Sequence, residues 1–258
     1  MRQDFQDLSL REAVYADAFM EGKAIDIHKE VRSKNIQIAT NDMVLNKSSN
    51  VLTTEAEQKL DITNWLPFAS KKYLISPDIN DYIFVPVLTI PSDLPNRNGV
   101  AFPLKTLLEF NVDAGCQGYK TFRGKPVHYE HQNKDPTKAK GVIVDSFLRR
   151  INGFGGGNVW KVMLLLAIDR TKDVSLSSQI ISGEMNSYSM GAYVDKYTCS
   201  YCGSDVGKCT HIKANSPVNF YELNGDLVFK NMHGMMGFEC SSVGTPAWSP
   251  AASNTVYM

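Results

Sequence analysis

The chain has 258 residues, of which 43% are hydrophobic and 21% charged, and its 27 basic residues balance its 27 acidic ones. This composition is typical of a globular protein with a sizeable core, and the neutral balance argues against a large nucleic-acid-binding surface. No apolar stretch approaches the roughly 18 residues of a membrane-spanning helix. The N-terminus lacks the apolar segment of a secretory signal, so we expect a cytosolic protein whose cysteines are not paired in disulfides.

Residues 1–70 differ in pattern from the rest and predict a helical N-terminal extension. Apolar residues between Leu8 and Ile25 recur near the spacing of an amphipathic helix, with charged residues between them. A second helix is predicted to start near Thr53, where the sequence suits a capping box.

Residues 71–258 predict one α+β domain built mainly of antiparallel strands. The expected strands cover 81–90, 124–131, 140–150, 159–169 and 186–198, and the expected short helices cover 102–110 and 175–185. Pro86 predicts that the first of these strands is an edge strand or carries a bulge. The run VWKVMLLLAID (159–169) predicts a strand buried on both faces.

Three cysteines and a histidine follow the last of these strands in a compact cluster. Cys199, Cys202, Cys209 and His211 supply the ligand number and type of a closed tetrahedral zinc site, and turn-forming residues separate them. A closed site leaves no position for a reacting water, so the expected role of the Zn²⁺ is structural. The alternative is a set of unrelated surface thiols. The segment HYEH (128–131) does not match the helical His-Glu-x-x-His arrangement of zinc hydrolases.

The same region contains a candidate nucleophile and candidate bases. Ser189 lies on a predicted strand, and Gly191 on the same face would leave room for a substrate backbone. A serine needs a neighbouring base to become nucleophilic at neutral pH. If 124–131 is a strand throughout, His128 and His131 face opposite ways, so at most one of them faces such a site. Spacing alone leaves open whether either of them meets Ser189.

Four segments in order resemble one known family. They are PVHYEHQNKDPTKAKGVIVDS, LLLAIDRTKD, SGEMNSYSMGAYVDKYTCSYCG with CTHI, and FECSSVGTPAWSPAA. Over roughly residues 73–252 the chain resembles the prohead (head-maturation) serine proteases of tailed bacteriophages, whose fold is similar to the barrel-like fold of the herpesvirus assemblin proteases. The closing segment of the family pattern matches Ser241 or Ser242, Val243, Pro246 and Ala247.

The resemblance implies roles for particular residues. Ser189 would be the nucleophile and His131 the general base, because His131 begins the loop before the GVI strand. For the group that orients the base, Asp169 at the end of the apolar strand is preferred and His128 is the reserve candidate. The backbone of RINGFGGG (150–157) could supply donors to an oxyanion.

The resemblance also implies substrates and a location. Such proteases act inside an immature capsid assembled in the bacterial cytoplasm, where they cut scaffold proteins, capsid proteins and themselves. Relatives favour cleavage after Glu in motifs that LTTE (52–55) fits, so residues 1–70 are a candidate propeptide removed near Glu55. Some relatives form rings, which leaves a homo-oligomer open, and we expect no membrane or direct nucleic-acid partner. The alternative function is a non-enzymatic zinc-bearing scaffold or nucleic-acid-binding protein of the virion.

Overall fold

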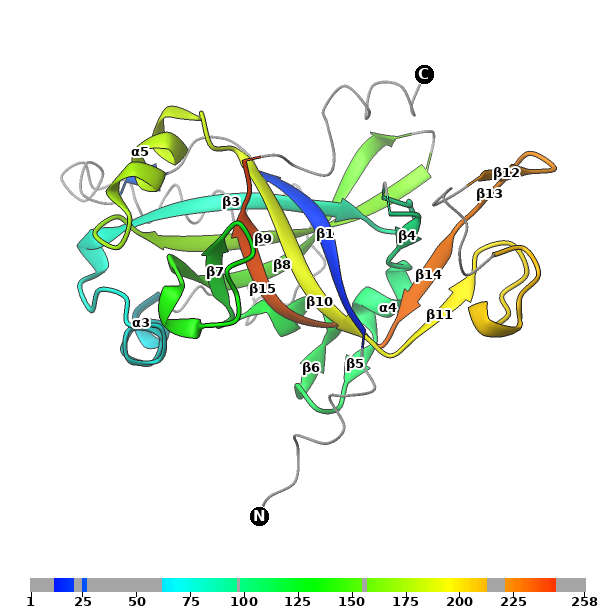
Figure 1. The fold of residues 1–258 in the computed structure, drawn as a ribbon, viewed down its shortest axis with the longest axis horizontal. Coiled ribbons are helices and arrows are strands. Elements are labelled where there is room, and N and C mark those ends of the chain that lie inside the picture. Colours follow the sequence, from blue (N-terminus) through cyan, green and yellow to red (C-terminus); the bar gives the residue numbers. More distant parts are fainter. Residues whose placement is uncertain are drawn as a thin grey trace, which may run out of the picture.

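A computed structural model gives the fold of the chain, and it describes residues 12–20, 25–26, 62–96, 98–154, 157–212 and 221–244. Its main feature is an eight-stranded sheet in the order β1-β10-β15-β7-β8-β9-β3-β2 (Figure 1). β1 also pairs with β3, so the sheet curls until its two sides meet. The α+β class and the mainly antiparallel, barrel-like sheet predicted from the sequence are therefore confirmed, with one parallel pair between β15 and β7.

The strands of the main sheet are β1 (Glu12–Met20), β2 (Ile25–Asp26), β3 (Tyr82–Pro91), β7 (Pro126–Tyr129), β8 (Gly141–Phe154), β9 (Gly157–Asp169), β10 (Ser187–Val194) and β15 (Met236–Ser242). The smaller sheets contain β4 (Val100–Ala101), β5 (Phe110–Asn111), β6 (Cys116–Gln117), β11 (Lys196–Cys199), β12 (Tyr221–Leu223), β13 (Asp226–Val228) and β14 (Lys230–His233). The α-helices are α3 (Ile62–Tyr73), α4 (Leu104–Leu108) and α5 (Val174–Ser182), and short 3-10 turns cover η3 (Ile79–Asp81), η4 (Gly118–Phe122), η5 (Pro136–Lys138) and η6 (Val206–Lys208). Each strand and helix predicted after residue 80 corresponds to one of these elements, except that the predicted strand 186–198 is divided between β10 and β11.

The predicted first helix is wrong, because Glu12–Met20 forms strand β1. This strand pairs antiparallel with β10 from Glu12 to Phe19 and with β3 from Ala18 to Met20. Helical and strand spacings overlap in so short and mixed an apolar pattern, and the unpaired edges of β10 and β3 offer backbone partners along its whole length. Tertiary pairing therefore overrides the local helical pattern.

The second predicted helix corresponds in part to α3. Residues 51–61, which include the proposed cleavage motif, lie outside the described residues. Ala69 and Tyr73 of α3 are buried, and the Tyr73 hydroxyl donates to the carbonyl of Gly124 (2.7 Å). The domain boundary at residue 70 stays a prediction, and it falls inside this packed helix.

The unbroken apolar sequence of β9 reflects its position in the fold, because both faces of this strand are covered. Val162, Leu164, Leu166 and Ile168 point into the curled sheet, where they join the main core. Met163, Leu165 and Ala167 point outward into a second core against α3. A fully buried side chain of this kind stabilises the fold by about 1.5–3 kcal/mol. Strands buried on both faces are continuously hydrophobic rather than alternating.

β3 differs from the edge strand that Pro86 predicted. It pairs with β9 on one side and with β2 and β1 on the other. Pro86 lies between Phe84, which pairs with β2, and Val87, which pairs with β1, so its missing N–H falls in the interval between the two partner strands. The predicted irregularity is present further on, between Leu88 and Pro91.

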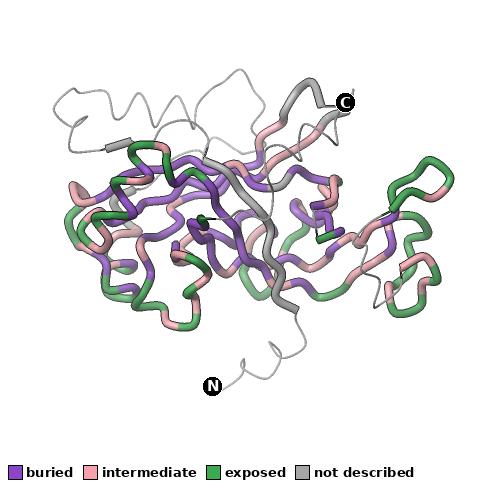
Figure 2. Tube along the Cα trace, turned by 45° about the horizontal axis from the view of Figure 1, so that its top comes forward, coloured by how far each residue is buried: buried purple, intermediate pink, exposed green. Residues whose placement is uncertain are grey.

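A second, smaller β unit extends from one end of the main sheet. β10 runs into β11 and β14 runs into β15, so one pair of long strands continues from the main sheet into the three-stranded sheet β11-β14-β4 (Figure 1). At the corner the Asp195 N–H donates to the carbonyl of His233 (2.8 Å). Gly234 has a φ of 68°, and a Cβ there would lie 1.9 Å from the Asp195 carboxylate. Burial is concentrated in the main sheet and falls off toward this unit (Figure 2).

Candidate active site

Strand β10 presents Ser189 on the face opposite the main core. Tyr188, Met190, Ala192 and Val194 point into that core, so Ser189 points away from it. Ser189 is buried, with 5% of its surface exposed. The room expected beside Gly191 is filled, because a Cβ at this glycine would lie 2.5 Å from the Phe238 ring. Gly191 therefore accommodates an aromatic ring of the protein itself.

Ser189 belongs to a row of polar residues that crosses three strands. Ser189 on β10 pairs with Ser241 on β15, and Ser241 pairs with His128 on β7. Residues opposite each other in neighbouring strands point to the same face, with Cβ atoms about 4.5–5.5 Å apart in antiparallel pairs. Ser241 and His128 are completely buried. The order of the strands thus brings together three residues separated by up to 113 positions in the sequence.

His131 lies in a tight turn that follows β7. Glu130 and His131 have positive φ angles of 48° and 53°. The Gln132 N–H donates back to the carbonyl of Tyr129 (3.1 Å), which closes the turn. Two consecutive left-handed residues are typical of the hairpin turns that usually contain Asn and Gly. A left-handed L-residue costs roughly 1–2 kcal/mol, so other contacts must hold this turn in place.

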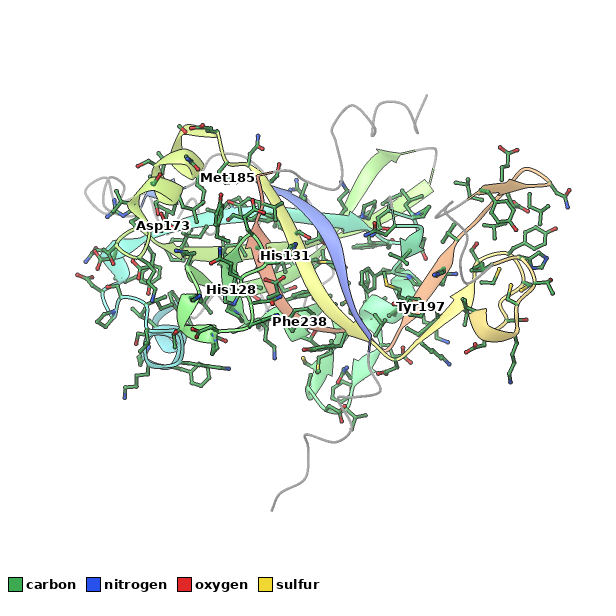
Figure 3. All side chains as sticks on the ribbon, in the orientation of Figure 1. His128, His131, Asp173, Met185, Tyr197 and Phe238 are labelled. Atoms are coloured by element: carbon green, nitrogen blue, oxygen red, sulfur yellow. The ribbon has the colours of Figure 1, made fainter. Side chains whose placement is uncertain are left out.

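Because β7 ends at Tyr129, the predicted alternation between the two histidines does not extend to His131. His131 Nδ1–H donates to Glu239 Oε1 at 2.9 Å, and Glu239 lies on β15 two residues before Ser241. His128 lies in register with Ser241, and His131 bonds to Glu239 on the same strand, so both histidines are on the Ser189 face, contrary to the sequence expectation. Figure 3 labels the two histidines. A third of the His131 side chain is exposed, whereas His128 is completely buried.

Glu239 is the residue of this site that the sequence did not indicate. Its side chain is completely buried, and its two oxygens accept from His131 Nδ1 and from the Ser241 hydroxyl (2.5 Å). A carboxylate is rarely buried unless it is paired. The one available signal was an acidic residue inside the otherwise uncharged strand MGFECSS, which is weak without knowledge of its neighbours.

Asp169, the preferred orienting group from the sequence, is fully used in a turn. One oxygen accepts from Thr171 N (2.8 Å), Thr171 Oγ1 (2.7 Å) and Lys172 N (3.2 Å). The other accepts from Ser76 N (2.7 Å). This is the pattern of a strand-end aspartate that caps the following turn. The contacts therefore favour Glu239 over Asp169 as the partner of His131.

His128, the reserve candidate, has no hydrogen bond to either ring nitrogen within the described part of the chain. Burial lowers its pKa, and the nearby charge of Glu239 opposes that shift. A buried histidine without partners is neutral in this environment. It lies opposite Ser241 in the strand register and makes no hydrogen bond to His131.

The glycine-rich hairpin proposed to stabilise an oxyanion lies far along β8 from the site. β8 has 14 residues and meets β7 at Gly141, which pairs with Val127. The hairpin is at the other end, beyond Phe154, after roughly 40 Å of extended strand. Residues 155 and 156 at its tip lie outside the described residues, as do Pro246 and Ala247 of the closing segment.

The predicted metal ligands do come together. The ligand atoms of Cys199, Cys202, Cys209 and His211 all lie within 4.8 Å of one another. The Sγ atoms of Cys202 and Cys209 are 3.5 Å apart, and Cys209 Sγ is 3.6 Å from His211 Nδ1. Four ligands about 2.3 Å from one ion at tetrahedral angles would be about 3.8 Å apart. The group could therefore bind a metal ion with little rearrangement.

Local contacts shape this cluster, which we call the knot (residues 199–211). Gly203 has a φ of 71°, and its N–H donates to the carbonyl of Cys199 (2.9 Å), which turns the chain back. Hydrogen bonds from Ser204 lower the pKa of the exposed Cys202 thiol to about 6. The thiolate is the form that ligates metals, so this thiol is ready to bind at neutral pH. The Tyr221 hydroxyl donates to the carbonyl of His211 (2.6 Å) and ties the knot to β12.

No family model and no curated protein matches the chain. Among solved structures, the capsid assembly protease gp21 of bacteriophage T4 aligns with it at a TM-score of 0.40 and 13% sequence identity, over 93% of this chain and 99% of that chain. This is a weak resemblance at the level of the fold, and it gives no information on the activity of the chain. Within the described residues, no helix is long and apolar enough to cross a membrane.

Proposed function

We propose that this chain is a serine endopeptidase of bacteriophage head maturation, with Ser189 as nucleophile and His131 as general base. The observation that carries the proposal is the buried Glu239 carboxylate bonded to His131 Nδ1, on the same sheet face as Ser189. A serine on β10, a histidine in the turn after β7 and a buried carboxylate on β15 are the parts of an acyl-transfer site.

In the proposed reaction, His131 Nε2 takes the proton of Ser189 as the serine attacks the scissile carbonyl. The same nitrogen then gives that proton to the leaving amine, and water clears the acyl-enzyme by the reverse sequence. Glu239 would hold the ring in the tautomer with hydrogen on Nδ1 and stabilise the imidazolium that forms. The Ser241 hydroxyl donates to the second oxygen of Glu239, which fixes the orientation of the carboxylate.

The resemblance of the sequence to prohead proteases supports the proposed substrates. These are the scaffold and capsid proteins of a phage and the chain itself, cut inside an immature capsid in the bacterial host. The motif Leu52–Glu55 is the proposed self-cleavage site. The cleavage motif lies between β2 and α3. β2 pairs with β3, and α3 packs in the same core as residues of β3 and β9.

We also propose that the knot holds a structural Zn²⁺. Three sulfurs and one imidazole nitrogen at near-tetrahedral separations suit this ion, and a fourfold protein ligand set leaves no position for a reacting water. When bound, the ion would cross-link the four ligands of the knot and would take no part in the reaction. In this proposal Cys199, Cys202 and Cys209 bind as thiolates and His211 binds through Nδ1 or Nε2.

The test of the protease proposal is intact-mass spectrometry of purified wild type, Ser189→Ala and His131→Gln, incubated in parallel and together with a candidate scaffold protein. We expect fragments only with wild type, including a cut after Glu55. Ser182→Ala, an exposed serine at the end of α5, is the matched control and should behave as wild type. Equal cutting by wild type and Ser189→Ala would contradict the assignment of the nucleophile. An intact Leu52–Glu55 segment in otherwise fully active protein would contradict the self-cleavage site alone.

A further inference from the structure

The turn that carries His131 is fastened to β15 by the residue just before it. The Glu130 N–H donates to the carbonyl of Ser242 (2.9 Å). The Glu130 side chain reaches further along the same strand direction, where its Oε1 accepts from the Gly244 N–H (2.7 Å). Glu130 thus bonds on both sides of Val243, once through its backbone and once through its carboxylate.

The strand that receives Glu130 is the same strand that positions the rest of the site. β15 carries Glu239, which binds the His131 ring, and pairs with β10 at Ser189. Just beyond its end, the Val243 N–H donates to the carbonyl of Ser187 (3.0 Å), which ties the segment to β10 as well. A shift of the turn relative to β15 would therefore move the base relative to both its carboxylate and the nucleophile strand.

The backbone of the turn makes this fastening necessary. Glu130 and His131 both occupy the left-handed region, which their side chains disfavour. The hydrogen bond from Gln132 to Tyr129 closes the turn but leaves its orientation toward β15 open. The backbone bond from Glu130 to Ser242 and the contact of the Glu130 carboxylate with Gly244 together fix this orientation.

We propose that Glu130 is a positioning residue of the active site: its carboxylate clamps the left-handed turn to the Gly244 N–H and so aims the His131 ring at Glu239. This inference rests on the proposed function for its effect on catalysis, but the clamp itself can be tested without any activity. Glu130 does not touch the reacting atoms, and its action passes through the backbone of His131.

The test compares Glu130→Asn, Glu130→Ala and Glu130→Gln. Asparagine tolerates the left-handed region better than glutamate, so Glu130→Asn should fold at least as well as wild type, yet its side chain is too short to reach Gly244. Glutamine keeps an oxygen acceptor at the same reach. Lys134→Ala, an exposed residue of the same loop, is the control.

The first readout is the NMR signal of the His131 ring in protein labelled at histidine nitrogen, assigned by comparison with His131→Gln. In wild type we expect the tautomer with hydrogen on Nδ1. In Glu130→Asn and Glu130→Ala the ring should show mixed tautomers, while Glu130→Gln and Lys134→Ala keep the wild-type signal. Thermal melting of each variant monitors folding.

The second readout is peptide hydrolysis with kcat and KM determined separately. Glu130→Asn should lose about tenfold in kcat with KM within twofold, because the base is misplaced while the substrate still binds. Unchanged His131 signals in Glu130→Asn and Glu130→Ala would overturn the clamp. An equal change in Glu130→Gln would also overturn it, because that variant keeps the acceptor. Absence of Ser189-dependent hydrolysis in wild type would count against the proposed function and leave the NMR result to decide on the clamp.

Discussion

The proposed active-site face and the knot are built in opposite ways. The four candidate ligands of the knot lie within 13 consecutive residues, and short turns bring them together. The proposed active-site face collects Ser189, His131 and Glu239 from three separate strands or their ends. The comparison teaches that a local cluster can be recognised from spacing, whereas a site made by strand pairing depends on a register that no short segment contains.

The difference also predicts how each region fails. A substitution in the knot should disturb the structure only near the knot, because its contacts are local. Damage on β15 should spread, because this strand contacts β10, β7 and the His131 turn at once. Each of the following changes tests one side of this contrast, and the largest expected effect comes first.

Replacing Glu239 by glutamine should lower kcat by about 10³–10⁴-fold. Glutamine keeps the size of the side chain, but it removes the charge that stabilises the imidazolium and can favour the wrong tautomer of His131. The measurement is peptide hydrolysis, with circular dichroism as a check of folding.

Asp169→Asn is the matched control for Glu239→Gln. It weakens a turn cap and should cost about 1–3 kcal/mol of stability without a selective loss of kcat. A larger kcat loss in Asp169→Asn than in Glu239→Gln would restore Asp169 as the orienting group.

Replacing Cys209 by serine should remove one bound Zn²⁺ per chain and unfold the knot locally. Structural zinc sites contribute directly to folding free energy, so exchange of amide hydrogens over residues 199–211 should rise by several orders of magnitude. Mass spectrometry of the exchanged protein and elemental analysis measure the two effects. Cys116→Ser, outside the knot, is the control, and equal zinc content in both variants would contradict the ligand assignment.

Replacing Gly191 by alanine should destabilise the protein by about 1–3 kcal/mol, because the new methyl group would meet the Phe238 ring at 2.5 Å. The double change Gly191→Ala with Phe238→Leu should recover part of this loss. Urea unfolding measures both. If Gly191→Ala alone is neutral, the ring moves freely and does not restrict the face that carries Ser189.

Acid should destabilise the protein through His128, with the smallest effect of this series. Burial lowers the pKa of His128 in the folded state, whereas the unfolded chain has a value near 6.5. As the pH falls below about 6.5, the unfolded state binds a proton that the folded state does not, so stability decreases until the pH passes the lowered folded pKa. His233 shifts in the same direction, and therefore the comparison must be with a variant.

His128→Leu removes the buried group and should flatten the loss of stability between pH 6.5 and 5, while the contribution of His233 remains. Urea unfolding at several pH values measures the slopes. Equal slopes in wild type and His128→Leu would show that His128 does not titrate in this way.

Whether a feature could be predicted from the sequence depends on how far apart in the chain the contacting residues lie. The five predicted strands after residue 80 and the knot depend on local spacing, and both were predictable, whereas β14 and β15 were not predicted. Glu239 was not, because only the pairing of β15 with its neighbours places it beneath His131. β1 was mistaken for a helix because its apolar residues fit two periods, and only the open edges of β10 and β3 decide between them.

The position of β1 has a consequence for any cut between β2 and α3. This strand provides backbone partners to both β10 and β3, and its Asp17 lies directly opposite Ser189 in the register. Cleavage after Glu55 would sever the covalent link to α3 but would leave these hydrogen bonds intact. The product would then be a two-chain protein in which the fragment 1–55 still contributes β1 to the main sheet. Cleavage would convert a strand pairing within one chain into a pairing between two chains.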